Sequence, residues 1–326
     1  NETEPVQIAW KTGKRNREYK PVNTQKTARE AIRELLNEIG EPTEYLEVHT
    51  AAMCALADEN AFPPSIQQLT FDKAGEIQTS LSNLLADRTF VRRLDATAQD
   101  PESGLWWLTQ PDPARNPLAD RVELELYQWL QSEKQIPQFT LWERINQRFS
   151  GYLTPPQDLV RTILDSYAEL DPYSYTWTLK ENETQKSRDE DINEIQQLLK
   201  AVGGKLGVEA EEDQLIAWYL GTNRETPIYR LVIYTTAILN RKAIMSERDV
   251  CETIVLIPGS RAGLMKFKID RDPYLRELLT SKIHFVKFRT LRSIEARADL
   301  SLEIWRVLID SDPLSRDETT QLSMFL

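Results

Sequence analysis

The sequence has few residues of the kinds that hold metals or form covalent cross-links. Its 326 residues include two cysteines and two histidines. Cys54 and Cys251 lie far apart in apolar segments, which predicts buried free thiols rather than a disulfide. His49 and His284 have no Cys or His partner at metal-binding spacing, so we expect packing or surface roles for both, with no metal site and no cofactor.

Long apolar runs and nucleotide-binding motifs are also missing. No apolar run approaches the roughly 20 residues that a membrane-spanning helix needs, and the N-terminus does not combine a charged start with an apolar core. No Gly-rich phosphate loop, G-x-G-x-x-G or G-x-S-x-G pattern occurs. We therefore expect a cytoplasmic protein without membrane contact, and we find no complete catalytic motif.

The residues that are present are typical of a folded protein with one local reversal of charge. Hydrophobic residues make up 40% of the chain and the formal net charge is −11. Segment 260–297 nevertheless carries ten Lys/Arg against four Asp/Glu. Because such a reversal attracts an anionic partner, we predict that this segment binds nucleic-acid backbone without reading bases, helped by Lys14, Arg15 and Arg17. The predicted contact residues are Arg261, Lys266, Lys268, Arg271, Lys287, Arg289 and Arg292.

The patterns of apolar residues and breakers predict an α+β multidomain protein with four parts: a mainly helical module with a basic N-terminal arm over 1–110, a winged-helix domain over 115–182, an α/β domain over 189–310 and a flexible tail over 311–326. In the first part, a capping box predicts a helix from Thr27 that stops at Gly40. Further helices are expected over 44–58 and 74–94, and a short strand at Trp106 and Trp107. The proline-rich segment 110–117 then ends the module.

The winged-helix prediction depends on three helices followed by a strand. Apolar spacing places helices at 118–129, 139–149 and 155–170, and alternating Tyr, Thr and Trp predict a strand over 173–179. The alternation of apolar and acidic residues over 122–126 would also suit a strand. The length of the segment and its content of Leu, Glu and Gln favour the helix. The third helix exposes Asp158, Asp165 and Glu169 against Arg161 alone. Since like charges repel phosphate, we expect this helix to face protein rather than a DNA groove.

An acidic stretch over 181–213 is interpreted as a solvated face around a helix at 191–202. Beyond it, strands are predicted at 214–220, 229–237, 252–257 and 283–287. Helices are expected at 240–249, from Ser260 and over 300–309. Helix, strand, strand, helix, strand is the order of the PD-(D/E)XK nuclease-like core, although any small α/β domain fits equally well. Asp213 stands at the first metal-binding position, but the next strand has neither a carboxylate nor a lysine. We therefore expect no nuclease chemistry.

Two short motifs indicate further binding. The turn at Pro258-Gly259-Ser260 leads a strand into a helix whose free backbone N–H groups suit a phosphate, although most such turns bind nothing. The closing QLSMFL is similar to the peptide that binds bacterial sliding clamps, with the contact residues Gln321, Leu322, Met324 and Phe325. A tail folded back on its own domain is the alternative.

Several segments together resemble the region that follows the methylase domain in large bacterial DNA-methylase-type proteins of modification and defence systems. They are AREAIRELLNEIGEPTEYLEVHTAAMCALA, PLADRVELELYQWL, LIPGSRAGLMKFKIDRDP, HFVKFRTLR and DPL…QLSMF. The resemblance implies a helical module, a winged helix and a nuclease-like domain without its metal ligands. It also implies a methylase or helicase subunit as a partner, while methyl transfer is not carried over because the methylase motifs are missing.

Three functions follow from these patterns. The first is a non-catalytic DNA-associated accessory or specificity protein that binds through residues 261–292. The second is a metal-dependent nuclease that uses Asp213. The third is a protein-interaction scaffold that presents the acidic winged helix and the tail to partner subunits.

Overall fold

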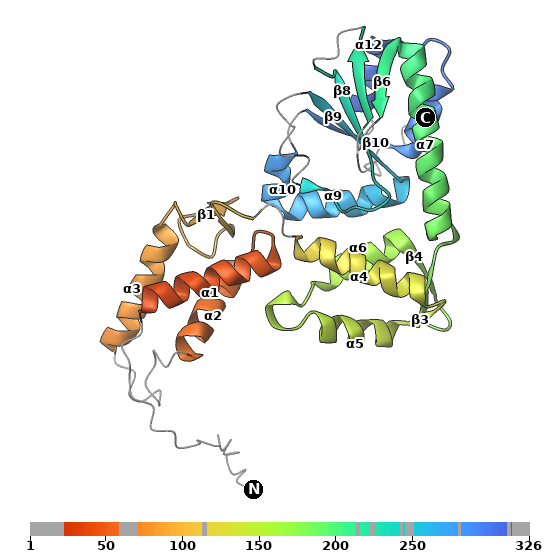
Figure 1. The fold of residues 1–326 in the computed structure, drawn as a ribbon. Coiled ribbons are helices and arrows are strands. Elements are labelled where there is room, and N and C mark those ends of the chain that lie inside the picture. Colours follow the sequence, from red (N-terminus) through yellow and green to blue (C-terminus); the bar gives the residue numbers. More distant parts are fainter. Residues whose placement is uncertain are drawn as a thin grey trace, which may run out of the picture.

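The computed structural model describes residues 23–58, 71–112, 116–212, 216–221, 226–241, 244, 251–279, 282–311 and 314. The predicted α+β class is confirmed: the fold combines helices with an open five-stranded sheet and two smaller sheets (Figure 1). For description we use an N-terminal unit (23–112), a middle unit (116–179) and a sheet unit (181–311). Among the described residues no helix combines the length and apolar character needed to cross a bilayer.

The N-terminal unit packs three helices beside a hairpin: α1 (Thr24–Ile39), α2 (Tyr45–Asp58), α3 (Phe71–Ala86), β1 (Val91–Leu94) and β2 (Leu105–Leu108). The predicted start of α1 at Thr27 is wrong, because the Asn23 side chain caps the helix by accepting from the Lys26 backbone N–H at 3.0 Å. Gly40 ends α1 in the left-handed conformation, as predicted. Residues 91–94 were expected at the end of a helix and instead pair antiparallel with β2.

The middle unit contains three helices and a three-stranded antiparallel sheet in the order β3-β5-β4. Its elements are α4 (Leu118–Ser132), β3 (Ile136–Pro137), α5 (Gln138–Arg148), η2 (Gly151–Leu153), α6 (Gln157–Tyr167), β4 (Ala168–Asp171) and β5 (Thr176–Leu179). Helix rather than strand is confirmed at 118–129, because Leu118, Val122 and Leu126 recur at helical spacing and are all buried. The third helix ends at Tyr167, three residues before the predicted end, because residues 168–171 pair with β5.

The sheet unit is built on five strands in the order β10-β9-β8-β7-β6, with β6, β7 and β8 antiparallel and β8, β9 and β10 parallel. Its elements are η3 (Glu181–Glu183), α7 (Gln185–Leu206), β6 (Val208–Glu212), β7 (Ile216–Leu220), β8 (Tyr229–Ile233), β9 (Glu252–Ile257), η4 (Gly259–Arg261), α9 (Ala262–Arg271), α10 (Pro273–Leu278), β10 (Ile283–Lys287), α11 (Phe288–Glu295) and α12 (Leu302–Asp310).

Strand β6 and helix α11 of this unit escaped the sequence prediction, and α10 was not predicted as a helix of its own. The acidic residues over 208–212 form the edge strand β6, and not only a solvated face, because they pair with β7. Helix α11 follows β10 directly and was not predicted at all. The helix expected over 240–249 lies almost entirely outside the described residues.

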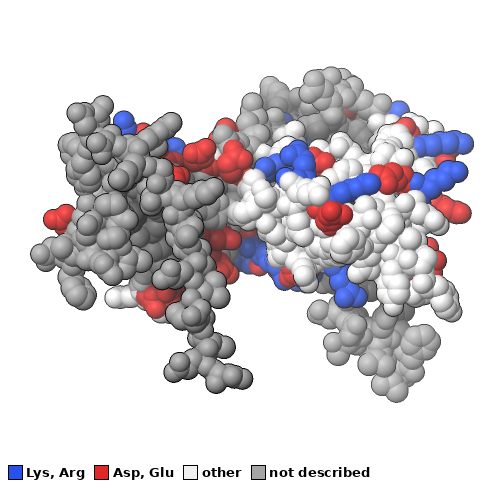
Figure 2. Space-filling model, turned by 90° about the horizontal axis from the view of Figure 1, so that it is seen from below, with Lys and Arg blue, Asp and Glu red and all other residues white. Residues whose placement is uncertain are grey.

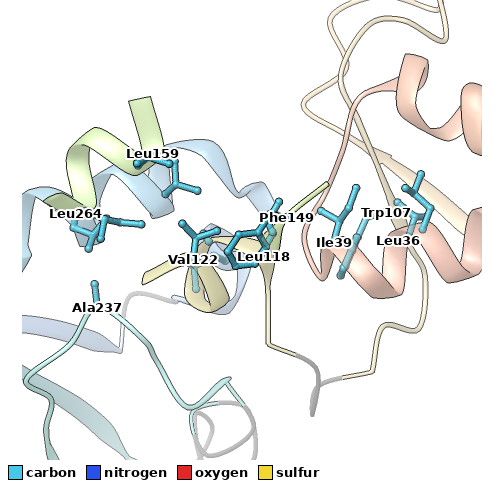
Figure 3. Packing of buried hydrophobic residues seen from close by; sticks show 14 of the residues in the cluster. Leu36, Ile39, Trp107, Leu118, Val122, Phe149, Leu159, Ala237 and Leu264 are labelled. Atoms are coloured by element: carbon cyan, nitrogen blue, oxygen red, sulfur yellow. The ribbon is translucent and has the colours of Figure 1, made fainter. Parts of the chain in front are cut away.

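Two apolar cores lie on opposite faces of the large sheet. Ile254 and Leu256 of β9 pack with α7, α11 and α12, whereas Val255 and Ile257 belong to a second cluster with α9. That second cluster continues through the middle unit into the N-terminal unit. Figure 3 follows it from Ala237 and Leu264 through Leu159, Val122, Leu118 and Phe149 to Ile39, Leu36 and Trp107. One continuous core therefore joins the three units and positions the polar contacts described next.

Candidate functional site

A buried ammonium group lies where α9 of the sheet unit meets α4 of the middle unit. Lys268 is 5% exposed, and its Nζ donates to Asp120 Oδ1 at 2.6 Å, to Glu123 Oε2 and to the Ala237 carbonyl oxygen at 3.0 Å. Burial opposes the charged form, but the two carboxylates outweigh it and raise the pKa of Lys268. Lys268 is thus a fully paired internal cation.

The carboxylate of Glu123 is satisfied on both oxygens. It accepts from the Tyr167 hydroxyl and, at 2.7 Å, from the backbone N–H of Ala237, in addition to Lys268. Burial and the nearby charge of Glu123 raise the pKa of Tyr167 well above its ordinary value, so the phenol stays a hydrogen-bond donor. This carboxylate links α4, α6 and the segment after β8.

A second buried cation, Arg261 of η4, lies at the same interface between the sheet unit and the middle unit. Its guanidinium is fully buried, pairs with Glu183, and donates to the Ser166 carbonyl oxygen at 2.8 Å and to the Thr235 carbonyl oxygen at 3.1 Å. The guanidinium carbon lies 3.4 Å from the centroid of the Tyr167 ring. The site leaves no room for a phosphate on this guanidinium.

Glu183 also changes the interpretation of the turn before α9. Ser260 Oγ donates to Glu183 Oε1 at 3.2 Å. At the turn Pro258-Gly259-Ser260, a carboxylate of the same chain therefore already meets the serine hydroxyl and the adjacent guanidinium. Phosphate binding by the backbone N–H groups of this turn stays a prediction.

A third polar contact extends the network toward the N-terminal unit. Arg241 Nη2 lies 3.1 Å from Asp272 Oδ2, and both side chains are at least nine-tenths buried. Burial, followed by the charge of Asp272, raises the pKa of Glu41 to about 8, and Glu41 follows the glycine that ends α1. Carboxyl groups from all three units thus gather around Arg241 and Lys268.

The five other predicted contact residues divide between the interior and the surface. Lys287 is 3% exposed, so with Arg261 and Lys268 it contradicts the prediction of seven cations on an accessible surface. Arg271 pairs with Asp158, and Arg292 pairs with Asp191 at 3.1 Å and with Glu194 at 2.6 Å.

Lys266 pairs with Asp270 at 2.6 Å along its own helix, and Arg289 is exposed at the surface. Lys266, Arg271 and Arg292 keep between 42% and 52% of their side chains exposed. Of the seven predicted contact residues, three are therefore buried, three are paired surface cations, and the seventh, Arg289, is exposed.

The partners of the cationic segment explain the local reversal of charge. Asp120, Glu123 and Asp158 belong to α4 and α6 of the middle unit, and Glu183 belongs to the short helix that follows it. The basic residues of η4 and α9 therefore complement acidic residues earlier in the same chain. At these positions, the local excess of Lys and Arg in the sequence therefore indicates an interface within the chain.

No protein-family model and no curated protein matches this chain. The resemblance to the region that follows the methylase domain in DNA-methylase-type proteins accordingly stays a prediction that depends on the segments quoted above.

Several predicted site residues lie outside the described part of the chain. They are Asp213, the N-terminal residues Lys14, Arg15 and Arg17, and the tail residues Gln321, Leu322, Met324 and Phe325. Within the described residues, no group of three or more His, Cys, Asp or Glu side chains is arranged to hold a metal ion. Strand β8, the second strand of the predicted nuclease-like core, reads YRLVI and contains neither carboxylate nor lysine.

The two histidines and two cysteines have ordinary environments. His284 Nδ1 lies 2.8 Å from Asp310 Oδ1, and the His49 ring is tilted against that of Tyr45 with ring centroids 5.5 Å apart. Both cysteines are free, as predicted, but Cys54 is exposed on α2, so its predicted burial is wrong.

A groove of about 1010 Å³ opens in the middle unit between α5, α6 and the β4–β5 hairpin. Trp142, Leu170 and Trp177 line its walls together with two carboxylates and two cations, Asp165, Glu169, Arg161 and Lys180. Phe139 and Tyr173 are 80% and 93% exposed on the same unit. Sequence reasoning missed this groove, although the alternating aromatic residues of 173–179 were noticed as a strand.

The buried acids were missed as well, and a usable signal for them exists. Asp120 and Glu123 fall on the helix face that also carries Ala119, Val122 and Leu126, all of which are buried. A carboxylate within an apolar helical stripe needs a buried partner. Lys268 of α9 gives the corresponding signal on the other side of the interface, because it also lies between apolar residues in the sequence.

Proposed function

We propose that this chain is a non-catalytic accessory module of a bacterial DNA modification or defence system, and that it acts as a scaffold by presenting its middle unit to a protein partner. The observation that carries the proposal is the internal neutralisation of the basic segment: Arg261 and Lys268 are buried against acids, and Arg271 and Arg292 pair with acids at the surface. Little of the positive charge over 261–292 is left for an external partner.

The middle unit is assigned as a winged-helix domain. Its order of helix, strand, helix, helix, strand, strand and its sheet order β3-β5-β4 support the assignment. Asp158, Asp165 and Glu169 lie on its third helix and the strand that follows. Because these carboxylates repel phosphate, the domain suits a protein surface better than a DNA groove.

The groove between α5, α6 and the β4–β5 hairpin is the proposed docking place. Tyr175 lines this groove and is 64% exposed. Exposed aromatic side chains in a groove are typical of protein interfaces, where Trp, Tyr and Phe dominate the binding free energy. In Figure 2 the part of the molecule on the right is largely uncharged, and its Lys and Arg side chains lie beside Asp and Glu. A methylase or helicase subunit is the partner that the resemblance implies.

The sheet unit is assigned as a PD-(D/E)XK-like domain that has lost its metal ligands. Support comes from the antiparallel strands β6, β7 and β8 followed by the parallel strand β9, and from the composition of β8. Nuclease activity would require Asp213. Cleavage assays with Mg²⁺ and Mn²⁺ on the wild type and on Asp213→Ala check this point, and cleavage that is lost in the variant would overturn the non-catalytic assignment.

A titration against duplex DNA tests the scaffold proposal directly. We expect the double variant Arg271→Ala/Arg292→Ala to bind duplex DNA as the wild type does at about 50 mM salt. A loss of affinity of tenfold or more would show that these cations contact phosphate. Replacing Phe139 and Tyr173 by serine should abolish co-purification with a methylase or helicase subunit encoded nearby, while the Arg271/Arg292 variant keeps it.

DNA-backbone binding through residues 261–292 is the second candidate, and the exposure of four cations favours it. Surface ion pairs contribute little, about 0–1 kcal/mol, so phosphate can replace Asp270, Asp158 or Glu194 as the partner of Lys266, Arg271 or Arg292. Together with Arg289 these residues would make a reduced contact surface.

Sliding-clamp binding through the tail is a separate proposal. It depends on Gln321, Leu322, Met324 and Phe325 alone. Deletion of residues 321–326 should abolish binding to the clamp without changing the stability of the described fold, and clamp binding that survives the deletion would remove the proposal.

A further inference from the structure

A second groove, in the N-terminal unit, has a charge composition unlike that of the groove in the middle unit. It measures about 730 Å³ and lies between α3, β1 and the segment that joins β1 to β2. Arg88, Arg92 and Arg93 line it, and no Asp or Glu is among its described lining residues. In a chain of net charge −11 this is a concentration of positive charge that the middle-unit groove, lined by two carboxylates and two cations, does not have.

The three arginines are held in different ways. The Arg93 guanidinium donates to the carbonyl oxygens of Ala98, Gln99 and Asp100 at 2.6–3.2 Å, so it is fixed in place without losing its charge. Arg92 Nη2 lies 2.7 Å from Glu277 of α10 in an exposed pair. Arg88 is exposed, and its side chain has no acidic partner among the described residues.

The remaining wall of the groove adds groups that suit nucleotides. Gln78, Ser82 and Gln99 supply amide and hydroxyl groups, and Tyr45 supplies a partly exposed ring. A positively charged groove combined with an aromatic surface is the arrangement by which proteins bind single-stranded nucleic acid, where cations follow the backbone and rings stack on bases. The volume is also far larger than one phosphate ion requires.

We propose that this groove binds the sugar–phosphate backbone of a single nucleic-acid strand, with Arg88 and Arg92 contacting phosphate, Arg93 supplying fixed positive charge and Tyr45 stacking on a base. The inference is independent of the scaffold function and of the cations over 261–292. In binding, phosphate replaces Glu277 as the partner of Arg92, which costs little because that pair is exposed to solvent.

Fluorescence anisotropy with a labelled oligothymidylate of about 20 nucleotides tests the proposal in the full chain. We expect the wild type to bind at about 50 mM salt. The slope of the logarithm of the binding constant against the logarithm of the salt concentration should become shallower by about 0.7 for each phosphate contact that a variant removes. Arg88→Glu should weaken binding by tenfold or more, Arg88→Ala less, and both should fold normally because the exposed side chain has no hydrogen bond or ion pair among the described residues. Lys186→Glu reverses one exposed charge on α7 and should leave the affinity within twofold.

Four results would overturn the assignment. The first is that the wild type does not bind the oligonucleotide, and the second is that Arg88→Glu binds it with the affinity of the wild type. The third is equal affinity of the wild type for a duplex of the same length. The fourth is binding of heparin without binding of the oligonucleotide. The variant Lys14→Ala/Arg15→Ala/Arg17→Ala separates the N-terminal segment from the groove, and loss of binding in that variant alone would also overturn it. The variant Arg271→Ala/Arg292→Ala should bind the oligonucleotide with the affinity of the wild type. Failure of the groove proposal is therefore distinguishable from failure of the scaffold proposal.

Discussion

Lysines two residues apart on α9 have opposite environments. Lys268 is buried between Asp120 and Glu123, whereas Lys266 is 42% exposed and pairs with Asp270 on its own helix. Removal of one partner from a buried ion pair leaves charge that water cannot solvate. The contribution of a lysine to stability in this helix is therefore decided by its burial rather than by its charge.

We expect Lys268→Met to lower the free energy of unfolding by about 3–5 kcal/mol, because it leaves two buried carboxylates unpaired. The matched control Lys266→Met should change it by about 0.5 kcal/mol or less. Urea denaturation of both variants measures the difference. Equal effects would contradict the buried-network description.

The pKa of Glu41 gives a prediction with a defined sign. Burial and the charges of Asp272 and Asp120 raise this pKa to about 8, against the partial compensation of Arg241 and Lys268. Between the ordinary carboxyl pKa and that value the folded state binds more protons than the unfolded state, so the contribution of Glu41 to stability falls as pH rises through this window.

Glu41→Gln should therefore be more stable than the wild type by a margin that grows between pH 6 and pH 8.5. Urea midpoints at the two pH values check this. A margin that is constant with pH would show that Glu41 does not titrate in the window.

At this scale the sequence could predict which residues are charged but not which charges meet. Lys268 and Glu123 are 145 positions apart, and their contact exists only once α9 packs on α4. The carboxylates within the apolar stripe of α4 indicate that a buried partner is needed, but nothing local identifies it. For this reason Arg261, Lys268 and Lys287 were predicted at a surface that they do not reach.

Among the elements, most helices were predictable and the short strands were not. Helices α2, α4 and α5 follow from their own apolar spacing and agree with prediction to within a few residues. The strands β1, β3, β4 and β6 have two to five residues each, and only pairing with a neighbour defines them. Tertiary pairing therefore overrode the local preference for helix at 91–94 and 168–170.

The junction between α1 and α4 depends on a glycine. Gly40 has φ of 71°, and a Cβ at this position would lie 2.8 Å from Pro117 Cα and 3.0 Å from the Asn116 carbonyl oxygen. Gly207 ends α7 with φ of 68°, and a Cβ there would meet nothing within 4 Å. The two glycines share a backbone conformation and differ in the space around it.

Gly207→Ala should destabilise the protein by about 1 kcal/mol, which is the cost of a left-handed alanine. Gly40→Ala should cost at least about 2 kcal/mol more, because backbone atoms of the next unit must move. Thermal unfolding of the two variants measures this difference. Equal shifts of the melting temperature would mean that the N-terminal and middle units do not pack closely at this junction.

In the whole molecule, the core that joins the units predicts cooperative unfolding. One buried cluster extends from Ile32 in α1 through Val122 in α4 to Leu264 in α9, and the charged network crosses the same interfaces. The domain boundaries predicted near residues 110–115 and 182–189 fall between the N-terminal, middle and sheet units. That these units are separate domains stays a prediction, because the apolar contacts continue across the boundaries.

We expect a single calorimetric transition for the wild type. Ile32→Ala and Leu199→Ala remove buried side chains from the two ends of the molecule, in α1 and in α7, and each should lower the free energy of unfolding by about 2–5 kcal/mol. If the units unfold together, both substitutions shift the same transition. Two resolved transitions, with Ile32→Ala moving one and Leu199→Ala the other, would show that the shared core and the buried ion pairs do not couple the N-terminal unit to the sheet unit.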